Sequence, residues 1–190
     1  MPRSFITFGS SLIVAFLGVA NVSAATCPAP SGSTITVNSP VTTLGCTVAT
    51  GQSLIVNSPN GSIVGSPTGQ GIVEVTGASG SVTNNGLIQE ATGGSANGIY
   101  VGAFNSLTSI TNGGTISTDS GQAAIYLGFS GNIGVTSGGI TNTGTIANYS
   151  TNYQAISNVA GTIYSIVNSG VITASVEAIQ NFGTIGTIQN

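Results

Sequence analysis

The sequence predicts an all-β fold in which short parallel strands stack into a β-helix, a β-solenoid with repeats of about 20–30 residues. Two observations lead to this prediction. A short motif recurs along the chain, and its residues form strands and turns rather than helices. The composition supports a buried core, because 40% of the 190 residues are hydrophobic and only 3% are charged. A disordered chain would show the opposite balance.

The recurring motif is an aliphatic residue, any residue, Asn, any residue, Gly, any residue and Ile. Four copies occupy residues 82–88, 110–116, 140–146 and 166–172. Their asparagines, Asn84, Asn112, Asn142 and Asn168, are 28, 30 and 26 residues apart. Between the copies a small residue precedes an isoleucine, at Gly98-Ile99, Ala124-Ile125, Ala155-Ile156 and Ala178-Ile179. Periods of this length indicate stacked repeats, each with at least two strands.

Stacked repeats place identical positions of successive coils next to one another. The motif therefore predicts an inward isoleucine ladder made of Ile110, Ile116, Ile140, Ile146, Ile166 and Ile172. The four asparagines and the nearby glycines are expected at the corners, since both residue types tolerate the left-handed conformation. Asparagine amides can also hydrogen-bond from coil to coil. The alternative interpretation is that Asn-x-Gly marks hairpin turns in an antiparallel sandwich.

The first 25 residues are predicted to be a signal peptide. Arg3 precedes a largely apolar stretch at residues 5–19, and Val22-Ser23-Ala24 supplies small residues before the expected cleavage site. An uncleaved anchor is one alternative, but the apolar stretch is shorter than the roughly 20 residues that span a bilayer. A lipoprotein signal at Cys27 is another. We therefore expect export through the inner membrane, with the periplasm in transit and the cell surface or the medium as destination.

Residues 26–80 are predicted to form an N-terminal cap with the first coils, and residues 81–190 the solenoid repeats. Cys27 and Cys46 are the only cysteines, and they are expected to pair in an oxidising compartment. On loop-entropy grounds such a disulfide stabilises the fold by about 3 kcal/mol. Two cysteines in a chain without histidine cannot supply the four ligands of a structural zinc site.

Charged side chains are too few to support most binding and catalytic chemistry. Arg3 is the only cation, and the acids are Glu74, Glu90, Asp119 and Glu177. Nucleic-acid binding is excluded because it depends on Lys and Arg. The acids follow the motif asparagines at different offsets, so no carboxylate pair is expected to align for glycoside hydrolysis. The sequence predicts no enzyme, no catalytic or metal site and no cofactor. A polysaccharide-degrading β-helix is the less favoured alternative.

The Asn-x-Gly-x-Ile and Ala-Ile repeats after a signal peptide resemble the passenger domains of autotransporters, the type V secreted proteins of Gram-negative bacteria. The resemblance covers about residues 30–190. It implies a right-handed β-helix at the cell surface, often adhesive, with an outer-membrane translocator barrel as partner in the same chain or a separate one. No such barrel follows the repeats, so we expect a passenger truncated at its C-terminus. A fragment of an exoprotein exported by a partner pore is the alternative.

A carbohydrate-binding face is a further alternative, with a glycan or host surface as the partner. Stacked tyrosines bind sugars, and the tyrosines are Tyr100, Tyr126, Tyr149, Tyr153 and Tyr164. Flat threonine arrays bind ice, and threonines recur in Gly-Thr-Ile units at Thr115, Thr145, Thr162 and Thr184. Strand propensity and partial core packing explain the same residues without any ligand.

Overall fold

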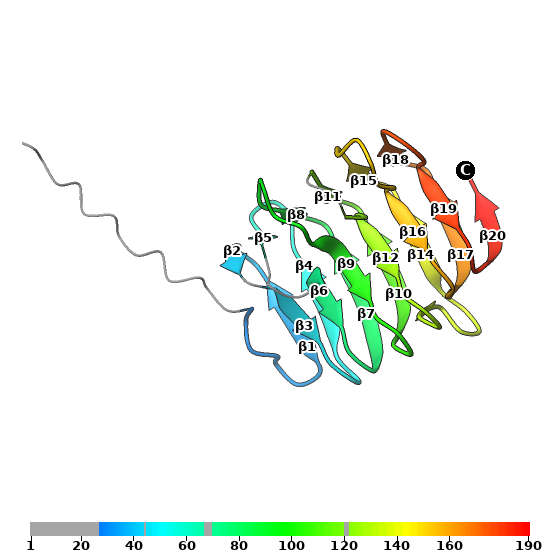
Figure 1. Cartoon of the computed structure of the whole chain (residues 1–190). Helices are drawn as coiled ribbons and strands as arrows, with labels where there is room; N and C mark the ends of the chain where they lie inside the picture. The colour runs from blue at the N-terminus through cyan, green and yellow to red at the C-terminus, as the bar shows by residue number, and fades with distance from the viewer. Residues whose placement is uncertain (1–26, 44, 67–69, 120–121) are drawn as a thin grey trace, which may run out of the picture.

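The computed structural model describes residues 27–43, 45–66, 70–119 and 122–190 (Figure 1). These residues form parallel strands that stack coil upon coil along one axis, in about six turns. The predicted all-β parallel solenoid is confirmed, whereas its right-handed winding stays a prediction. The predicted signal peptide, residues 1–25, lies outside the described residues. Within the described part of the chain, no helix has the length and apolar character needed to cross a membrane.

Three parallel sheets form the walls of the solenoid. Sheet A contains β1 (Thr34–Val37), β4 (Ser53–Val56), β7 (Ala78–Asn84), β10 (Ser106–Asn112), β13 (Asn132–Ile133), β14 (Gly139–Asn142), β17 (Thr162–Asn168) and β20 (Thr184–Gln189). Sheet B contains β2 (Pro40–Thr43), β5 (Ser62–Gly65), β8 (Leu87–Glu90), β11 (Thr115–Thr118), β15 (Thr145–Asn148) and β18 (Val171–Ala174). Sheet C contains β3 (Cys46–Val48), β6 (Gly71–Val75), β9 (Asn97–Val101), β12 (Ile125–Leu127), β16 (Ile156–Asn158) and β19 (Ile179–Asn181).

Each coil passes through sheets A, B and C in that order, which defines three corners: A–B, B–C and C–A. A coil thus has a third strand beyond the two that the motif requires. One coil is irregular, because β13 and β14 are separated by residues 134–138 and both pair with β10 and β17. The sheets continue without interruption through residue 80, which lies inside β7.

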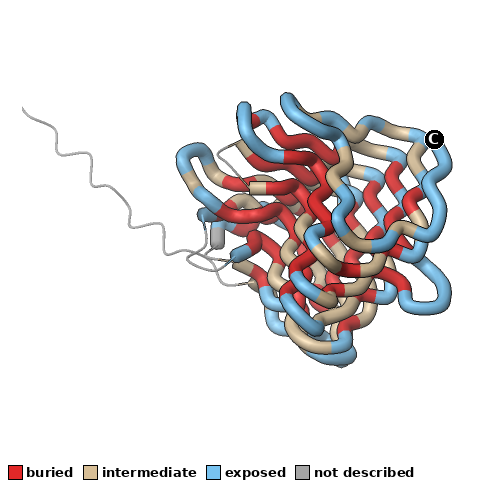
Figure 2. The backbone as a smooth tube through the Cα atoms, turned by 45° about the vertical axis from the view of Figure 1, so that its right-hand side comes forward, coloured by how far each residue is buried: buried red, intermediate tan, exposed pale blue. Residues whose placement is uncertain are grey.

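The core consists of side-chain ladders parallel to the solenoid axis. A sheet A ladder joins, in order, Ile35, Leu54, Val82, Ile110, Ile140, Ile166 and Ile188. A sheet B ladder joins Val41, Ile63, Ile88, Ile116, Ile146 and Ile172. The ladder isoleucines of the inner coils are fully buried, and Ile172 is partly buried because β18 ends its sheet. Alternation of inward and outward residues along each short strand produces this layering (Figure 2).

The motif asparagines lie one above another at the A–B corner. The amide nitrogen Nδ2 of Asn84 donates to Oδ1 of Asn112 at 2.8 Å, and Asn112 donates to Asn142 in the same way at 2.7 Å. Asn142 donates to Asn168 at 2.7 Å, and Asn168 to Asn190 at 2.6 Å. The hydrogen bonds of this asparagine ladder therefore all run in one direction, from each coil to the next.

The asparagine ladder begins abruptly at Asn84. In the two preceding coils its position is held by Val37 and Val56, which are fully buried. Asn84 Oδ1 consequently has no hydrogen-bond partner among the described residues. The corner thus changes from apolar to polar packing between the second and third coils.

The corner glycines are required for a different reason from the one the sequence suggested. For the motif residues, the prediction that corner Asn and Gly adopt the left-handed conformation is wrong, since none of the motif asparagines or their following glycines has positive φ. It holds at the C–A corner, where Gly51 and Gly77 have φ 73° and 82°. The motif glycines, Gly86, Gly114, Gly144 and Gly170, instead stack in a column. A Cβ atom on Gly114, Gly144 or Gly170 would lie 2.1–2.2 Å from the carbonyl oxygen of the glycine in the preceding coil. Close backbone approach therefore selects glycine.

Gly114 and its neighbour Gly113 provide a matched test of this close approach. A Cβ on Gly114 would lie 2.1 Å from the Gly86 carbonyl oxygen, whereas one on Gly113 would first meet the Asn85 side chain at 3.1 Å. Gly114→Ala is expected to lower the free energy of unfolding by about 3 kcal/mol, and Gly113→Ala by less than about 1 kcal/mol. Urea unfolding measures both. Equal losses would contradict the close-approach explanation.

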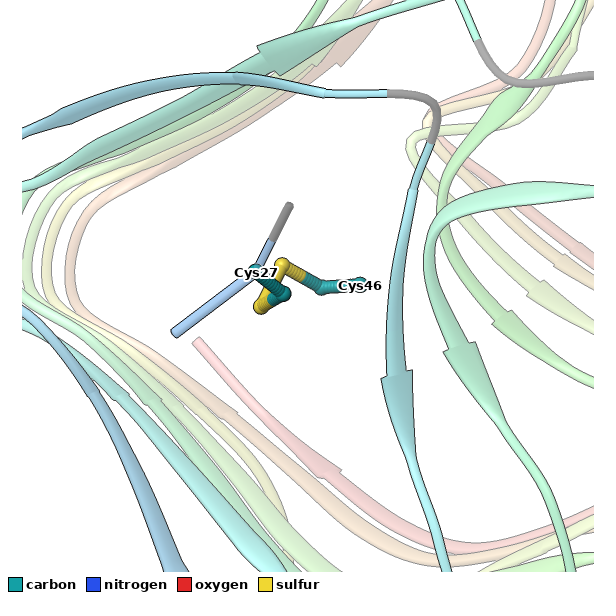
Figure 3. The surroundings of a disulfide bond; sticks show 2 residues. All are labelled: Cys27 and Cys46. Carbon is teal, nitrogen blue, oxygen red and sulfur yellow. A yellow bond between two sulfur atoms is a disulfide. The ribbon is translucent and has the colours of Figure 1, made fainter. Parts of the chain in front are cut away.

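The N-terminal segment is fastened to the first coil by a disulfide between Cys27 and Cys46 (Figure 3). Cys46 begins β3 and is fully buried, and Cys27 packs against the core from outside the strands. The bond joins residues 19 apart in the sequence. The disulfide therefore ties the segment before β1 covalently to the first coil, at the N-terminal end of the solenoid.

Candidate interaction surface

The exposed large apolar side chains of the described residues include a row along the C–A corner. Phe104, Phe129, Val159 and Phe182 are 78%, 64%, 37% and 72% exposed, and we call them the C–A row. Each follows a strand of sheet C by one to three residues, in four successive coils. Such side chains usually face the core, so a row of them in solvent is a candidate contact surface.

Backbone hydrogen bonds hold the loops of this row in register. The Val159 N–H donates to Leu127 O at 3.1 Å, and the Phe182 N–H donates to Asn158 O at 2.8 Å. The Phe104 N–H donates to Phe129 O at 3.2 Å. Backbone hydrogen bonds thus join each of these loops to a neighbouring coil.

Phe104 and Phe129 pack edge to face, with ring centroids 6.3 Å apart and an interplanar angle of 74°. Phe104 has φ 62° and Ser130 has φ 57°, the left-handed region that non-glycine residues seldom occupy. The side chain of Asn105 braces this loop, accepting from the Gly77 N–H at 2.7 Å and donating to Val75 O at 2.9 Å. The backbone is thus held in an unfavourable conformation where it presents an aromatic ring to solvent, which is typical of functional surfaces.

The tyrosines do not form one face. Tyr100 and Tyr126 stack on the outside of sheet C, with centroids 5.5 Å apart and an interplanar angle of 13°. Partial burial, followed by the neighbouring Tyr126 and Glu74, raises the pKa of the Tyr100 hydroxyl above its usual value. The other tyrosines, Tyr149, Tyr153 and Tyr164, are exposed elsewhere, in the β15–β16 loop and on β17. Because the stacked pair covers its own inner ring faces, it offers a sugar less surface than two free rings.

The threonines of the Gly-Thr-Ile units divide between two sheets. Thr115 pairs with Thr145 in sheet B, and Thr162 pairs with Thr184 in sheet A. On the neighbouring strands the same register positions are occupied by Leu87 and Val171 in sheet B and by Asn132 in sheet A. The structure therefore gives two threonine pairs and no flat array of four.

Two of the four acids, Glu90 and Asp119, are neighbours in adjacent coils, although they follow their motif asparagines at different offsets. Glu90 is 1% exposed at the B–C corner, and its Oε1 accepts the N–H of Ala96 while its Oε2 accepts that of Asp119 at 3.4 Å. Both carboxylate oxygens of Glu90 are thereby engaged by the backbone of the loops around them. Glu74 faces outward from β6, and Glu177 accepts a hydrogen bond from Gln180 Nε2 at 3.3 Å. Among the described residues, no three Cys, Asp or Glu side chains gather into a possible metal site.

Comparison with known proteins gives no relative: the chain matches no family of known proteins, no curated protein and no solved structure. The class of the protein is accordingly defined by its own geometry. It is a parallel β-solenoid with an asparagine ladder at one corner and an exposed aromatic row at another. The sequence reasoning did not single out this row, since its members share no motif and stand at different distances from the preceding strand.

Proposed function

We propose that this chain is an exported, non-catalytic scaffold at the surface of a Gram-negative bacterium and that it adheres through the C–A row. The observation that carries the proposal is the exposure of three phenylalanines and one valine, one in each of four successive coils, along one corner. Exposed apolar rows of this kind are typical of protein–protein or surface contacts. The resemblance to autotransporter passengers and the predicted signal peptide agree with a surface location reached through an outer-membrane translocator.

The chemistry of the surface favours apolar adhesion over electrostatic adhesion. Arg3 is the only cation in the chain, and it belongs to the predicted signal peptide, so the exported part would carry no Lys or Arg. A partner recognised through charge would lose affinity as salt screens it. Contact through phenylalanine rings depends on burial of apolar area and persists at high ionic strength.

The surroundings of Glu90, a buried acid, also favour a scaffold role. The carboxylate of Glu90 is buried and receives backbone N–H groups on both oxygens, which suits an acid that fixes the conformation of the 91–96 loop. A hydrolase acid has to reach substrate, and this one is enclosed by its own loops. The proposed activity is therefore binding without catalysis.

The proposal is tested by adhesion of beads that carry the purified chain. Beads with the wild-type chain are expected to stick to epithelial monolayers and to polystyrene under flow, equally well in low and high salt. The double variant Phe104→Asn/Phe129→Ser should retain at least about tenfold fewer beads, because each aromatic contact contributes on the order of 1–2 kcal/mol. Asn at 104 is chosen because it tolerates positive φ.

The matched control is Val135→Ser/Val176→Ser, which removes two exposed apolar side chains away from the row. This variant is expected to adhere like the wild type. Equal adhesion of the Phe104/Phe129 variant and the wild type would refute the row as the adhesive surface. Wild-type adhesion no better than that of bare beads would refute the adhesive function itself.

A further inference from the structure

Four asparagines of the chain are followed directly by glycine, namely Asn60, Asn85, Asn97 and Asn112. In such a pair the backbone nitrogen of the glycine can attack the side-chain carbonyl carbon of the asparagine, because glycine has no side chain to hinder the approach and its backbone is permissive. Asparagine is for this reason a chemically labile residue. The attack requires an unbonded glycine N–H and an asparagine side chain that can turn toward it.

Two of the four pairs are held on both sides of the reacting bond. The side chain of Asn112 is fully buried in the asparagine ladder, and the Gly113 N–H donates to a backbone carbonyl of the preceding coil at 2.8 Å. Asn97 is 4% exposed, its amide donates a hydrogen bond at 2.7 Å, and the Gly98 N–H donates another at 3.2 Å. These asparagines can react only after the surrounding backbone has opened.

The other two asparagines, Asn60 and Asn85, are exposed and differ in the glycine that follows. The Gly61 N–H donates to Asn57 O at 2.6 Å. The Gly86 N–H, in contrast, donates no hydrogen bond to any residue that the structure describes, and the Asn85 side chain forms none with those residues either. Of the four pairs, Asn85 and its glycine alone combine an exposed amide with an unbonded backbone nitrogen.

The unbonded nitrogen lies in the coil at which the asparagine ladder begins. One coil later, the two residues that follow the motif asparagine both donate to Asn84 O, at 2.8 and 3.0 Å. At Asn85 the first of these two bonds is present, with Val56 O as acceptor at 2.8 Å, and the second is missing. The Gly86 nitrogen thus lacks an acceptor in the same coil in which Asn84 Oδ1 lacks a donor among the described residues.

We propose that Asn85 is a site of self-modification, at which the folded chain converts asparagine into aspartate and isoaspartate. The Gly86 nitrogen gives its proton to solvent and attacks the side-chain carbonyl carbon of Asn85. A C–N bond forms to close a succinimide ring, and the former amide nitrogen takes up a proton and leaves as ammonia. Water then opens the ring at either carbonyl, without any transfer of electrons. The reaction makes the formal net charge at pH 7 one unit more negative than its value of −3.

The two products differ in their effect on the A–B corner. Aspartate keeps the backbone unchanged and places one carboxylate at an exposed position. Isoaspartate lengthens the main chain by a methylene group directly before Gly86. The carbonyl oxygen of Gly86 accepts from the Thr115 N–H at 2.9 Å and lies so close to Gly114 that a Cβ atom there would be 2.1 Å away. Because this close packing leaves no space for a displaced backbone, the isoaspartate form should unfold at a lower temperature than the aspartate form.

Peptide mapping of aged protein tests the proposal. The folded chain is incubated at mildly alkaline pH and digested with pepsin at acid pH, and mass spectrometry measures how much of each asparagine has exchanged its amide for a hydroxyl. Conversion at Asn85 should be at least about tenfold faster than at the other three, which must wait for the fold to open. In concentrated urea all four should convert at similar rates, since each precedes a glycine. Equal rates in the folded chain, or the same preference in urea, would overturn the proposal.

Asn85→Gln and Asn60→Gln form a matched pair, since each replaces one exposed asparagine by a residue that reacts far more slowly through a larger ring. Isoelectric focusing of aged Asn85→Gln should show little of the acidic species that the wild type and Asn60→Gln accumulate. Persistence of that species in Asn85→Gln would overturn the assignment. Asn85→Asp supplies the added charge alone, and the isoaspartate fraction of aged wild type should melt below it. Identical melting temperatures would overturn the predicted strain at the corner.

Discussion

Ile140→Asp is expected to abolish cooperative folding of the coils around it. Ile140 is fully buried between Ile110 and Ile166 in the sheet A ladder, so its replacement puts a carboxylate among aliphatic side chains, and the residues that the structure describes include no Lys or Arg to pair with it. An unpaired buried charge destabilises a fold by more than about 4 kcal/mol. Thermal unfolding followed by circular dichroism should show a broad transition that begins far below that of the wild type.

The same ladder supplies the control for this prediction. Ile188→Asp makes an identical chemical change at the exposed end of the ladder and should leave the transition nearly unchanged. Glu177→Ala, in an exposed loop, should also stay within about 0.5 kcal/mol of the wild type. Because coils contact only their neighbours, hydrogen exchange in Ile140→Asp should rise first in β10, β14 and β17. Equal destabilisation by Ile140→Asp and Ile188→Asp would contradict the solenoid core described above.

Asn142→Asp is the second substitution with a large expected effect. Asn142 is fully buried, and its Nδ2 donates to Asn168 Oδ1 at 2.7 Å, to Val171 O at 3.1 Å and to Gly144 O at 3.2 Å. Aspartate replaces this donor by an oxygen that faces three acceptors. The buried charge and the lost hydrogen bonds together are expected to lower the free energy of unfolding by about 3–5 kcal/mol. Urea denaturation measures the change.

Protonation should reverse part of this loss. An aspartic acid held neutral can donate one hydrogen bond, and burial raises the pKa of this carboxyl above its unfolded value of about 4. The Asn142→Asp variant is therefore expected to gain stability relative to the wild type as the pH falls toward about 4, with the gain complete below that pH. The matched control is Asn57→Asp, which removes a donor from the exposed bond between Asn57 Nδ2 and Asn38 Oδ1. This variant should lose no more than about 0.5 kcal/mol. A comparable loss in both variants would show that burial of the ladder does not matter.

Repetition is the reason why so much of the fold was predictable. The motif recurs with its isoleucines and asparagines in fixed places, and stacking of identical positions then determines the register, as in Ile116 beside Ile146. The asparagine ladder follows from the same logic, because an amide has both a donor and an acceptor to pass along the axis. Export, surface location and the absence of catalysis were also predicted, and they stay proposals.

Features that depend on backbone geometry could not be predicted from the sequence. The glycine column is selected by the carbonyl oxygen of the preceding coil, and a motif cannot show how closely two coils approach. The third strand of each coil was hidden because the Asn-x-Gly motif looks like one segment but spans two strands. In the copy at residues 110–116, Asn112 ends β10 of sheet A and Ile116 lies in β11 of sheet B, while the small-residue–Ile element, as at Ile125, supplies sheet C. The C–A row was missed for a related reason. Phe104 and Phe129 reach the same corner from loops of different length.

Pulsed electron–electron double resonance, which measures the distance between two nitroxide labels, tests the stacked arrangement most directly. One label is fixed at Gln189, and the second is placed in turn at Thr111, Thr83, Ile55 and Thr36, which lie in one outward column at increasing numbers of coils from Gln189. Labelled chain is diluted with unlabelled chain so that distances within one molecule are measured. With strands about 4.8 Å apart, the parallel solenoid predicts distances of about 14, 19, 24 and 29 Å, rising by one strand spacing per coil. Distances that fail to rise in this order, as an antiparallel sandwich would give, would contradict the solenoid and every proposal that rests on it.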